Sequence, residues 1–127
     1  MKQISADPLL DHFRKPRHVG RVDGATGVGR AENAACGDQV EISVKTASGR
    51  VERAGFLCQG CSAAIGAASY VTERIIGKRL EELLALDADR LLGELGEGRA
   101  TRRHGMQLAV RAAIEAVRAG SGRHSEQ

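Results

Sequence analysis

Residues 39–57 read QVEISVKTASGRVERAGFL, and their pattern predicts the central elements of the fold. From residue 39 to 46, apolar side chains alternate with polar ones, which is the pattern of a strand with one buried face. The ASGR segment at 47–50 predicts a turn in which Gly49 adopts a positive φ. Residues 51–57 predict the returning strand, so the chain contains an antiparallel hairpin.

Helical patterns lie on both sides of this hairpin, and most of them follow it. Residues 5–13 predict a short helix that ends before Pro16, and a glycine-rich loop then leads to a short strand at 28–32. The helices expected after the hairpin are 62–76, a short one around 80–84, one that begins after Asp87, and 106–119. This order predicts an α+β fold in which helices cover one face of a small antiparallel sheet of about three strands.

The length and composition predict a single domain. The chain has 127 residues, of which 42% are hydrophobic, and this share excludes a disordered chain. We expect one domain over 1–127, in which 120–127 is a flexible tail. No apolar run approaches the ~20 residues that cross a bilayer, and residues 1–10 lack the apolar stretch of a signal peptide. We therefore expect a cytoplasmic protein with no membrane partner.

Charge and aromatic content argue against a nucleic-acid partner. The formal net charge is only +3, and the basic residues form short clusters rather than one long stripe. One tyrosine and two phenylalanines are too few to stack against single-stranded nucleic acid. The basic clusters are best interpreted as solvated surface, although they would also suit an acidic partner.

Three cysteines indicate metal binding or sulfur chemistry. An odd number of cysteines without an export signal does not fit a disulfide framework, and such thiols stay reduced. Cys36 and Asp38 flank Gly37, whose backbone freedom allows both side chains to point at one centre. Cys58 and Cys61 are three positions apart, which allows both to face one metal ion.

His104, just before the last expected helix, would add an imidazole to this set. Zinc takes thiolate, imidazole and carboxylate ligands, whereas iron–sulfur clusters take thiolates with histidine as a known substitute, so the residues suit both. Other interpretations stay open at this point. Cys58 could be a small core side chain at a strand end, His104 a surface group, and the C-x-x-C pair a redox dithiol.

Five segments stand in a characteristic order along the chain. They are DHFRKPRHVG at 11–20, ACGD at 35–38, FLCQGCSAAI at 56–65, Gly77-Lys78 and Leu108-Ala109. The first three resemble the motifs D-H-[FY]-x-x-P-R-[HN]-x-G, A-C-G-D and F-x-x-x-G-C-x-x-[AS]-I. Together they resemble the NifU/IscU-type iron–sulfur cluster assembly scaffolds.

The resemblance implies a fold, a role and a set of ligands. Members are small α+β scaffolds (SufE/NifU-like) that hold a transient iron–sulfur cluster, here expected as [2Fe-2S], or zinc in its place. They receive sulfur from a cysteine desulfurase and pass the cluster to acceptor proteins, and they are not enzymes. By position, Cys36, Asp38 and Cys61 match family ligands, and His104 matches the histidine before the family's third cysteine. A cluster with too few ligands in one chain implies either a monomer or a cluster-bridged dimer.

The sequence departs from the family at two places. Gly105 stands where the family has its third cysteine, and we suggest that Cys58 replaces that ligand. EGRAT at 97–101 stands near the place of the family's chaperone-recognition motif, so we do not expect recognition by a dedicated Hsp70-type chaperone. The long insertion of the zinc-dependent SufU-type relatives is also missing.

Two further functions compete with the scaffold. The first is a zinc-bound sulfur (persulfide) acceptor that works with a cysteine desulfurase, which the missing third cysteine favours. The second is a structural or regulatory module in which the metal only holds the fold together.

Overall fold

The structure is a computed structural model that describes residues 7–125 and the side chains of residues 7–120. It contains three strands and five helices in an α+β arrangement, as the sequence predicts. The elements in order are α1 (Pro8–Arg14), β1 (Gly27–Asn33), β2 (Asp38–Ala47), β3 (Arg50–Gln59), α2 (Ser62–Ile75), α3 (Leu80–Leu83), α4 (Ala88–Leu95) and α5 (Ala100–Ser125).

The expected hairpin forms the centre of the sheet. The strand order is β1-β2-β3, and both neighbouring pairs are antiparallel. Val40, Ile42 and Val44 are fully buried on one face of β2, which confirms the alternation seen in the sequence. A bulge between Lys45 and Thr46 shifts the register just before the turn to β3.

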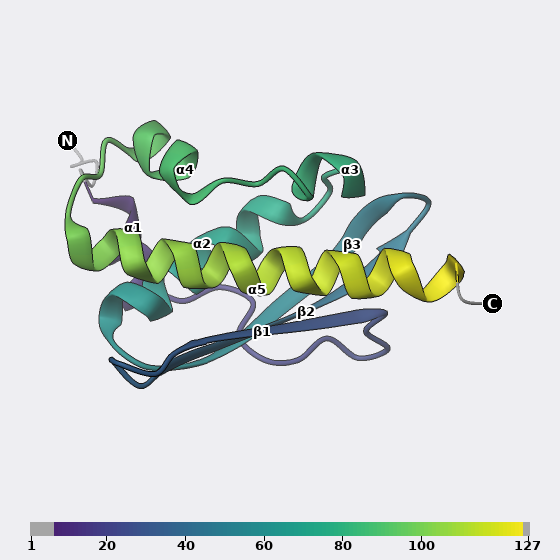
Figure 1. Ribbon diagram of the computed structural model, residues 1–127, viewed down its shortest axis with the longest axis horizontal. Coiled ribbons are helices and arrows are strands. Elements are labelled where there is room, and N and C mark those ends of the chain that lie inside the picture. The colour runs from purple at the N-terminus through teal and green to yellow at the C-terminus, as the bar shows by residue number, and fades with distance from the viewer. Residues whose placement is uncertain (1–6, 126–127) are drawn as a thin grey trace.

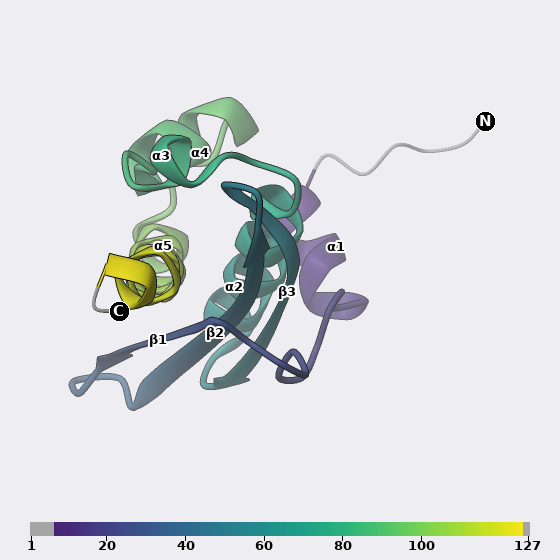
Figure 2. The ribbon, with the colours of Figure 1, turned by 90° about the vertical axis from the view of Figure 1, so that its right-hand side faces the viewer.

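Helices α2 and α5 cover the same face of the sheet, with α5 over β1 and α2 over β3 (Figure 2). The approach of α5 is close because β1 carries glycines where it meets the helix. A Cβ atom on Gly29 would lie 2.1 Å from the carbonyl oxygen of Ala112, which no side chain could tolerate. The alanines Ala109, Ala112, Ala113 and Ala116 keep this face of α5 flat enough for the contact.

The N-terminal segment covers what the two long helices leave open. Helix α1 packs on α2, where a Cβ atom on Gly66 would lie 2.6 Å from the carbonyl oxygen of Leu9. The following loop runs along the free edge of β3, with Gly20 donating its N–H to Phe56 at 2.7 Å. Its next turn reaches the other face of the sheet, where Val22 N–H donates to the buried Ser43 hydroxyl at 2.9 Å.

The last helix is longer at both ends than the sequence suggests. It begins at Ala100, whereas the apolar stripe begins at Met106, and it runs to Ser125, into the segment expected to be a tail. Its first turns carry no apolar stripe because their polar side chains have partners elsewhere, such as Asp7 for Arg102 and Asp89 for Arg103. Within residues 7–125, no helix is both long and apolar enough to span a membrane.

Three chain segments meet at one end of the molecule, opposite the β2–β3 turn. They are the β1–β2 turn, the start of α2 and the start of α5, all on the left of Figure 1. The five candidate ligands lie in or beside these segments. The fold therefore brings them to one end of the sheet from distant parts of the sequence. The two that are farthest apart, Cys36 and His104, are separated by 68 residues.

Candidate metal and sulfur site

Asp38 and Cys61 form the centre of the site. Asp38 opens β2 and is 7% exposed, and Cys61 is the N-cap of α2. One carboxylate oxygen of Asp38 accepts the backbone N–H of Cys61 at 3.1 Å, and the other lies 3.5 Å from its Sγ, which donates to it. The Cys61 side chain makes no hydrogen bond to the amides of its own helix, so among the described residues it is Asp38 that orients this thiol.

Gly60 makes the contact between Asp38 and Cys61 possible. A Cβ atom at this position would lie 2.4 Å from the near carboxylate oxygen of Asp38. Any other residue would push the carboxylate away from the N-terminus of α2. The glycine before Cys61 is therefore a packing requirement of the site.

Cys58 lies on the same face of the sheet as Asp38. It pairs directly with Val40 across the β2–β3 ladder, and Asp38 precedes Val40 by two residues. The Cys58 side chain is half-buried and packs against the core. Burial, reinforced by the negative charges of Asp38 and Cys61, raises the pKa of the Cys58 thiol to about 11. Cys58 is thus both a core side chain and a neighbour of the other two donors, so the two interpretations left open by the sequence are compatible.

Cys36 is exposed in the turn between β1 and β2. Both Cys36 and Gly37 donate their N–H groups to the carbonyl oxygen of Asn33, at 3.1 and 2.8 Å. Gly37 has a φ of 75°, in the left-handed region that glycine adopts without strain. The turn places the Cys36 thiol at the surface, and the thiol makes no hydrogen bond to any described residue.

His104 belongs to the second turn of α5 rather than to the segment before the helix. It is exposed and has no hydrogen bond or ion pair among the described side chains. The next residue, Gly105, packs against the start of α2. A Cβ atom on Gly105 would lie 2.8 Å from the carbonyl oxygen of Ala63, so the position expected for the family's third cysteine is closed by backbone.

The structure thus joins part of the expected ligand set. Asp38 and Cys61 are in contact, and Cys58 is their neighbour, whereas Cys36 and His104 stand apart at the surface. Among the described residues, no three histidine, cysteine or acidic side chains are arranged as a finished metal site. Holding a metal would require the described donors to move closer together than they lie in the structure.

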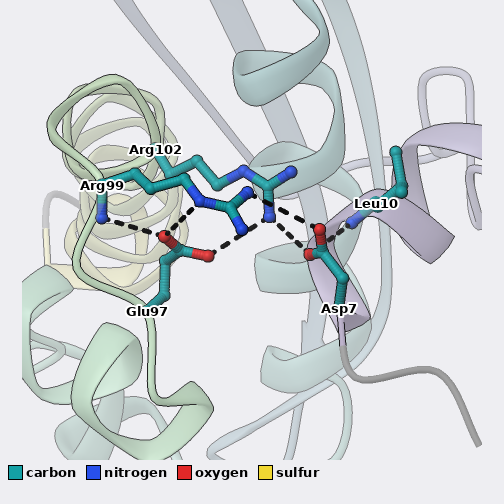
Figure 3. A network of polar contacts seen from close by, with 5 residues as sticks. All are labelled: Asp7, Leu10, Glu97, Arg99 and Arg102. Carbon is teal, nitrogen blue, oxygen red and sulfur yellow. Dashed lines mark hydrogen bonds and ion pairs between the residues drawn. The ribbon is translucent and has the colours of Figure 1, made fainter.

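A charged cluster fixes the start of α5 beside this site (Figure 3). The Arg102 guanidinium lies between two carboxylates, in contact with Asp7 and at 3.2 Å from Glu97. Arg99 reaches the same two acids at 3.7 and 3.6 Å, and Asp7 also caps α1 through Leu10 N–H. The hydrogen bond from Arg102 lowers the pKa of Asp7. These contacts tie α1, the α4–α5 loop and α5 together.

His12, on α1, is a polar side chain that the structure buries. It is 6% exposed, and its Nδ1 lies 2.7 Å from the Ser69 hydroxyl while its Nε2 lies 3.2 Å from Glu73. Ser69 also accepts the backbone N–H of Arg17 at 2.9 Å. Burial, together with the nearby Arg17 charge, lowers the pKa of His12, and Glu73 only partly opposes this. In the sequence, the burial of His12 is indicated only by its position three residues after Leu9, which is also buried on α1.

Comparison with known proteins gives a consistent family. The model of the NifU-like N terminal domain matches residues 4–127. Iron-sulfur cluster assembly scaffold protein IscU 1 of Archaeoglobus fulgidus is 38% identical over 112 residues, which are 88% of this chain and 73% of that protein. The scaffold protein IscU of Haemophilus influenzae is 35% identical over 94 residues, which are 71% of this chain and 75% of that protein.

Solved structures share the fold. The N-terminal NifU-like protein of Brucella abortus superposes with a TM-score of 0.74 at 18% identity, covering 91% of this chain and 92% of that one. A protein described as a putative scaffold for the SUF system, from Fervidobacterium islandicum, has a TM-score of 0.70 at 19% identity, covering 86% and 93% of the two chains. At these identities the likeness concerns the fold alone.

Proposed function

The chain belongs to the NifU-like N-terminal domain family, and on that basis we propose that it is a scaffold for iron–sulfur cluster assembly. In this role it binds a transient cluster and delivers it to acceptor proteins. The observation that carries the proposal is the contact of Asp38 with the exposed thiol of Cys61, beside Cys58. A hard carboxylate held against a soft thiol at the surface suits a cluster that must be released.

The thiols are the ligands we assign to the cluster. Cys61 and Cys36 are exposed, and Cys58 completes the three thiolates, since Gly105 offers no side chain. Asp38 or His104 would complete the set. Metal would replace the thiol proton of Cys58, whose raised pKa disfavours the free thiolate, so cluster binding releases protons and strengthens as pH rises.

The incomplete arrangement of donors supports a transient rather than a resident cluster. Cys36 lies on an exposed turn, so its approach to the other donors reshapes a surface loop rather than the core. We propose that the expected [2Fe-2S] form is held in this way, either within one chain or between two copies that each supply part of the ligands. Zinc is the alternative occupant.

The partners follow from this role. We propose that a cysteine desulfurase supplies the sulfur and that apo iron–sulfur proteins receive the cluster. The scaffold itself turns over no small substrate. The surface at Cys36 and Cys61 is where both kinds of partner would have to reach the cargo.

The test is the composition of protein purified without oxygen and reconstituted with iron and sulfide. We expect iron and acid-labile sulfide in equal amounts, with charge-transfer bands that are lost in Cys58→Ala. Val40→Ala is the matched control, because it removes the residue that faces Cys58 and leaves every thiol in place. Retention of the bands in Cys58→Ala would remove Cys58 from the ligand set, and stoichiometric zinc without sulfide in the wild type would contradict the cluster itself.

A second function has one observation in its favour. Because the position of the third cysteine is closed by backbone, the conventional set of cluster ligands is incomplete, and the chain could act as a zinc-bound persulfide acceptor. Sulfur transfer from a desulfurase to the chain that persists after all iron is removed, in protein that forms no cluster, would favour this function. Unfolding by a chelator would instead favour a structural metal.

A further inference from the structure

Two of the thiols have opposite surroundings although they are only three residues apart. Cys61 is exposed at the N-terminal end of α2, where a sulfur donor can reach it. Cys58 is half-buried in β3, with its side chain packed against the core. An incoming group therefore meets Cys61 first, and Cys58 is sheltered from it.

Asp38 connects the two thiols. Its carboxylate contacts Cys61 Sγ at 3.5 Å, and its place on β2 puts it on the same face as Cys58, diagonally across the ladder. Gly60, between the two cysteines, leaves the space that this grouping needs.

From this arrangement we propose that Cys58 is the resolving thiol for a persulfide carried on Cys61. The proposal rests on the sulfur-receiving role proposed above and adds the residue that turns received sulfur into sulfide. When an exposed thiol carries an extra sulfur atom, a sheltered thiol beside it in the same chain can attack it and release that sulfur.

The step balances without an external reductant. A persulfide donor leaves an outer sulfur on Cys61 Sγ. The Cys58 sulfur attacks Cys61 Sγ, a disulfide bond forms between them, and the bond to the outer sulfur breaks. The outer sulfur leaves with the electron pair as hydrosulfide, while the thiol proton of Cys58 passes to the Asp38 carboxylate or to the leaving group. Two cysteine sulfurs are oxidised and one sulfane sulfur is reduced; a dithiol reductant then restores the pair.

The product fits the proposed scaffold, because clusters contain sulfur as sulfide rather than as sulfane sulfur. Release of hydrosulfide beside Asp38 and Cys61 would deliver it where iron is to be bound. Once a reductant has restored both thiols, they are free to serve as ligands. Cys58 and Cys61 therefore first release the sulfide and later bind the cluster.

The test follows the sulfur by mass spectrometry in chelator-treated, full-length protein. Inorganic polysulfide serves as the donor, and its excess is removed before the time course. Trypsin gives one peptide, 54–74, that holds both Cys58 and Cys61, and another, 31–45, that holds Cys36. We expect peptide 54–74 first to gain one sulfur atom, and then to lose that sulfur together with two hydrogens as the disulfide closes and hydrosulfide is released, so that it ends two hydrogens lighter than the reduced peptide.

The variant Cys58→Ser should accept the sulfur on Cys61 and keep it. Its hydrosulfide release, without added thiol, should fall about tenfold or more below wild type. Val40→Ala controls for looser packing beside Cys58 and should release hydrosulfide as the wild type does. A persulfide that persists equally in wild type and Cys58→Ser, or a disulfide that joins peptide 54–74 to peptide 31–45, would overturn the inference.

Failure of the underlying role would look different. If Cys61 takes up no sulfur from polysulfide or from a cysteine desulfurase, the sulfur-receiving role is wrong, and the resolving role is wrong with it. If Cys61 takes up sulfur but no disulfide follows, only the role of Cys58 is wrong.

Discussion

Gly105 of α5 and Ala63 of α2 approach so closely that a Cβ atom on Gly105 would lie 2.8 Å from the Ala63 carbonyl oxygen. This contact packs the start of α5 against the start of α2, next to Cys61. This contact shows why a cysteine, which the family has at this position, would not fit in this chain. At this position the two helices are in close contact, and a side chain cannot be introduced there without moving one of them.

Substitution of Gly105 should therefore destabilise the protein. Gly105→Ala should lower the free energy of unfolding by about 1–3 kcal/mol, because the added methyl meets backbone rather than a movable side chain. Gly105→Cys should cost at least as much and should not increase iron binding. Urea unfolding and iron content check both variants.

Gly93→Ala is the control for this prediction. Gly93 lies in α4, and nothing lies within 4 Å of the place that an added methyl would take, so the change should raise stability by about 0.5–1 kcal/mol. Equal stability of Gly105→Ala and Gly93→Ala would contradict the close contact between α5 and α2.

Asp38→Ala should make the bound cluster longer-lived. The substitution removes the hard oxygen donor at the site and leaves the three thiols in place. The decay of the charge-transfer bands in the presence of a chelator measures the lifetime. Asp38→Asn separates charge from hydrogen bonding, since its amide oxygen can still accept the Cys61 N–H. A lifetime equal to wild type in both variants would show that Asp38 is not a determinant of release.

His12 should make stability fall between neutral and mildly acidic pH. Its pKa is lowered in the folded chain from an ordinary value of 6.5, so the unfolded chain binds the proton more readily. The stability that neutral His12 contributes is present above pH 6.5 and is lost as pH falls toward the lowered folded pKa. The carboxylates of Asp7 and Glu41, whose pKa values are lowered by arginine partners, lose their contribution only at more acidic pH.

The measurement is urea unfolding from pH 7.5 to 5 for the wild type and His12→Asn, which does not titrate and keeps an acceptor for the Ser69 hydroxyl. The slope of stability against pH should be smaller in the variant over this range. Identical slopes in the two proteins would show that the buried histidine does not titrate with folding.

Arg102 should contribute more than its surface neighbours because it lies between two acids. Arg102→Met should lower the free energy of unfolding by about 1–2 kcal/mol, since Asp7 and Glu97 lose the nearer and less exposed of their two shared arginine partners. Arg103→Met is the matched control, because its pair with Asp89 is exposed and should be worth less than about 0.5 kcal/mol. Thermal unfolding at low and high salt checks both, and a cost no larger for Arg102 than for Arg103 would contradict the role of the cluster.

The sequence predicts the sheet well because the pattern that defines a strand lies within a few consecutive residues. The alternation from Val40 to Val44 fixes both the strand and its buried face, and the order of elements fixes the α+β class. The contact of Asp38 with Cys61 is also consistent with the motifs that hold them, although its geometry depends on Gly60.

The features that the sequence does not predict depend on distant partners. His12 is buried beside Ser69, 57 residues later, which satisfies its ring nitrogen, and its spacing from Leu9 gives no indication of this partner. The first turns of α5 lack an apolar pattern because Arg102 reaches back to Asp7, 95 residues earlier. Propensity and periodicity describe neighbours along the chain, so neither could reveal these contacts.

Transfer of an assembled cluster is the decisive property of a scaffold. Protein reconstituted with iron and sulfide is mixed with an apo-ferredoxin in the presence of an iron chelator, and the spectrum of the ferredoxin is followed. We predict that the ferredoxin gains its cluster faster from the scaffold than from equal amounts of free iron and sulfide, and that the chelator does not prevent this. Transfer no faster than from free iron and sulfide, or transfer abolished by the chelator, would contradict a scaffold that delivers an assembled cluster.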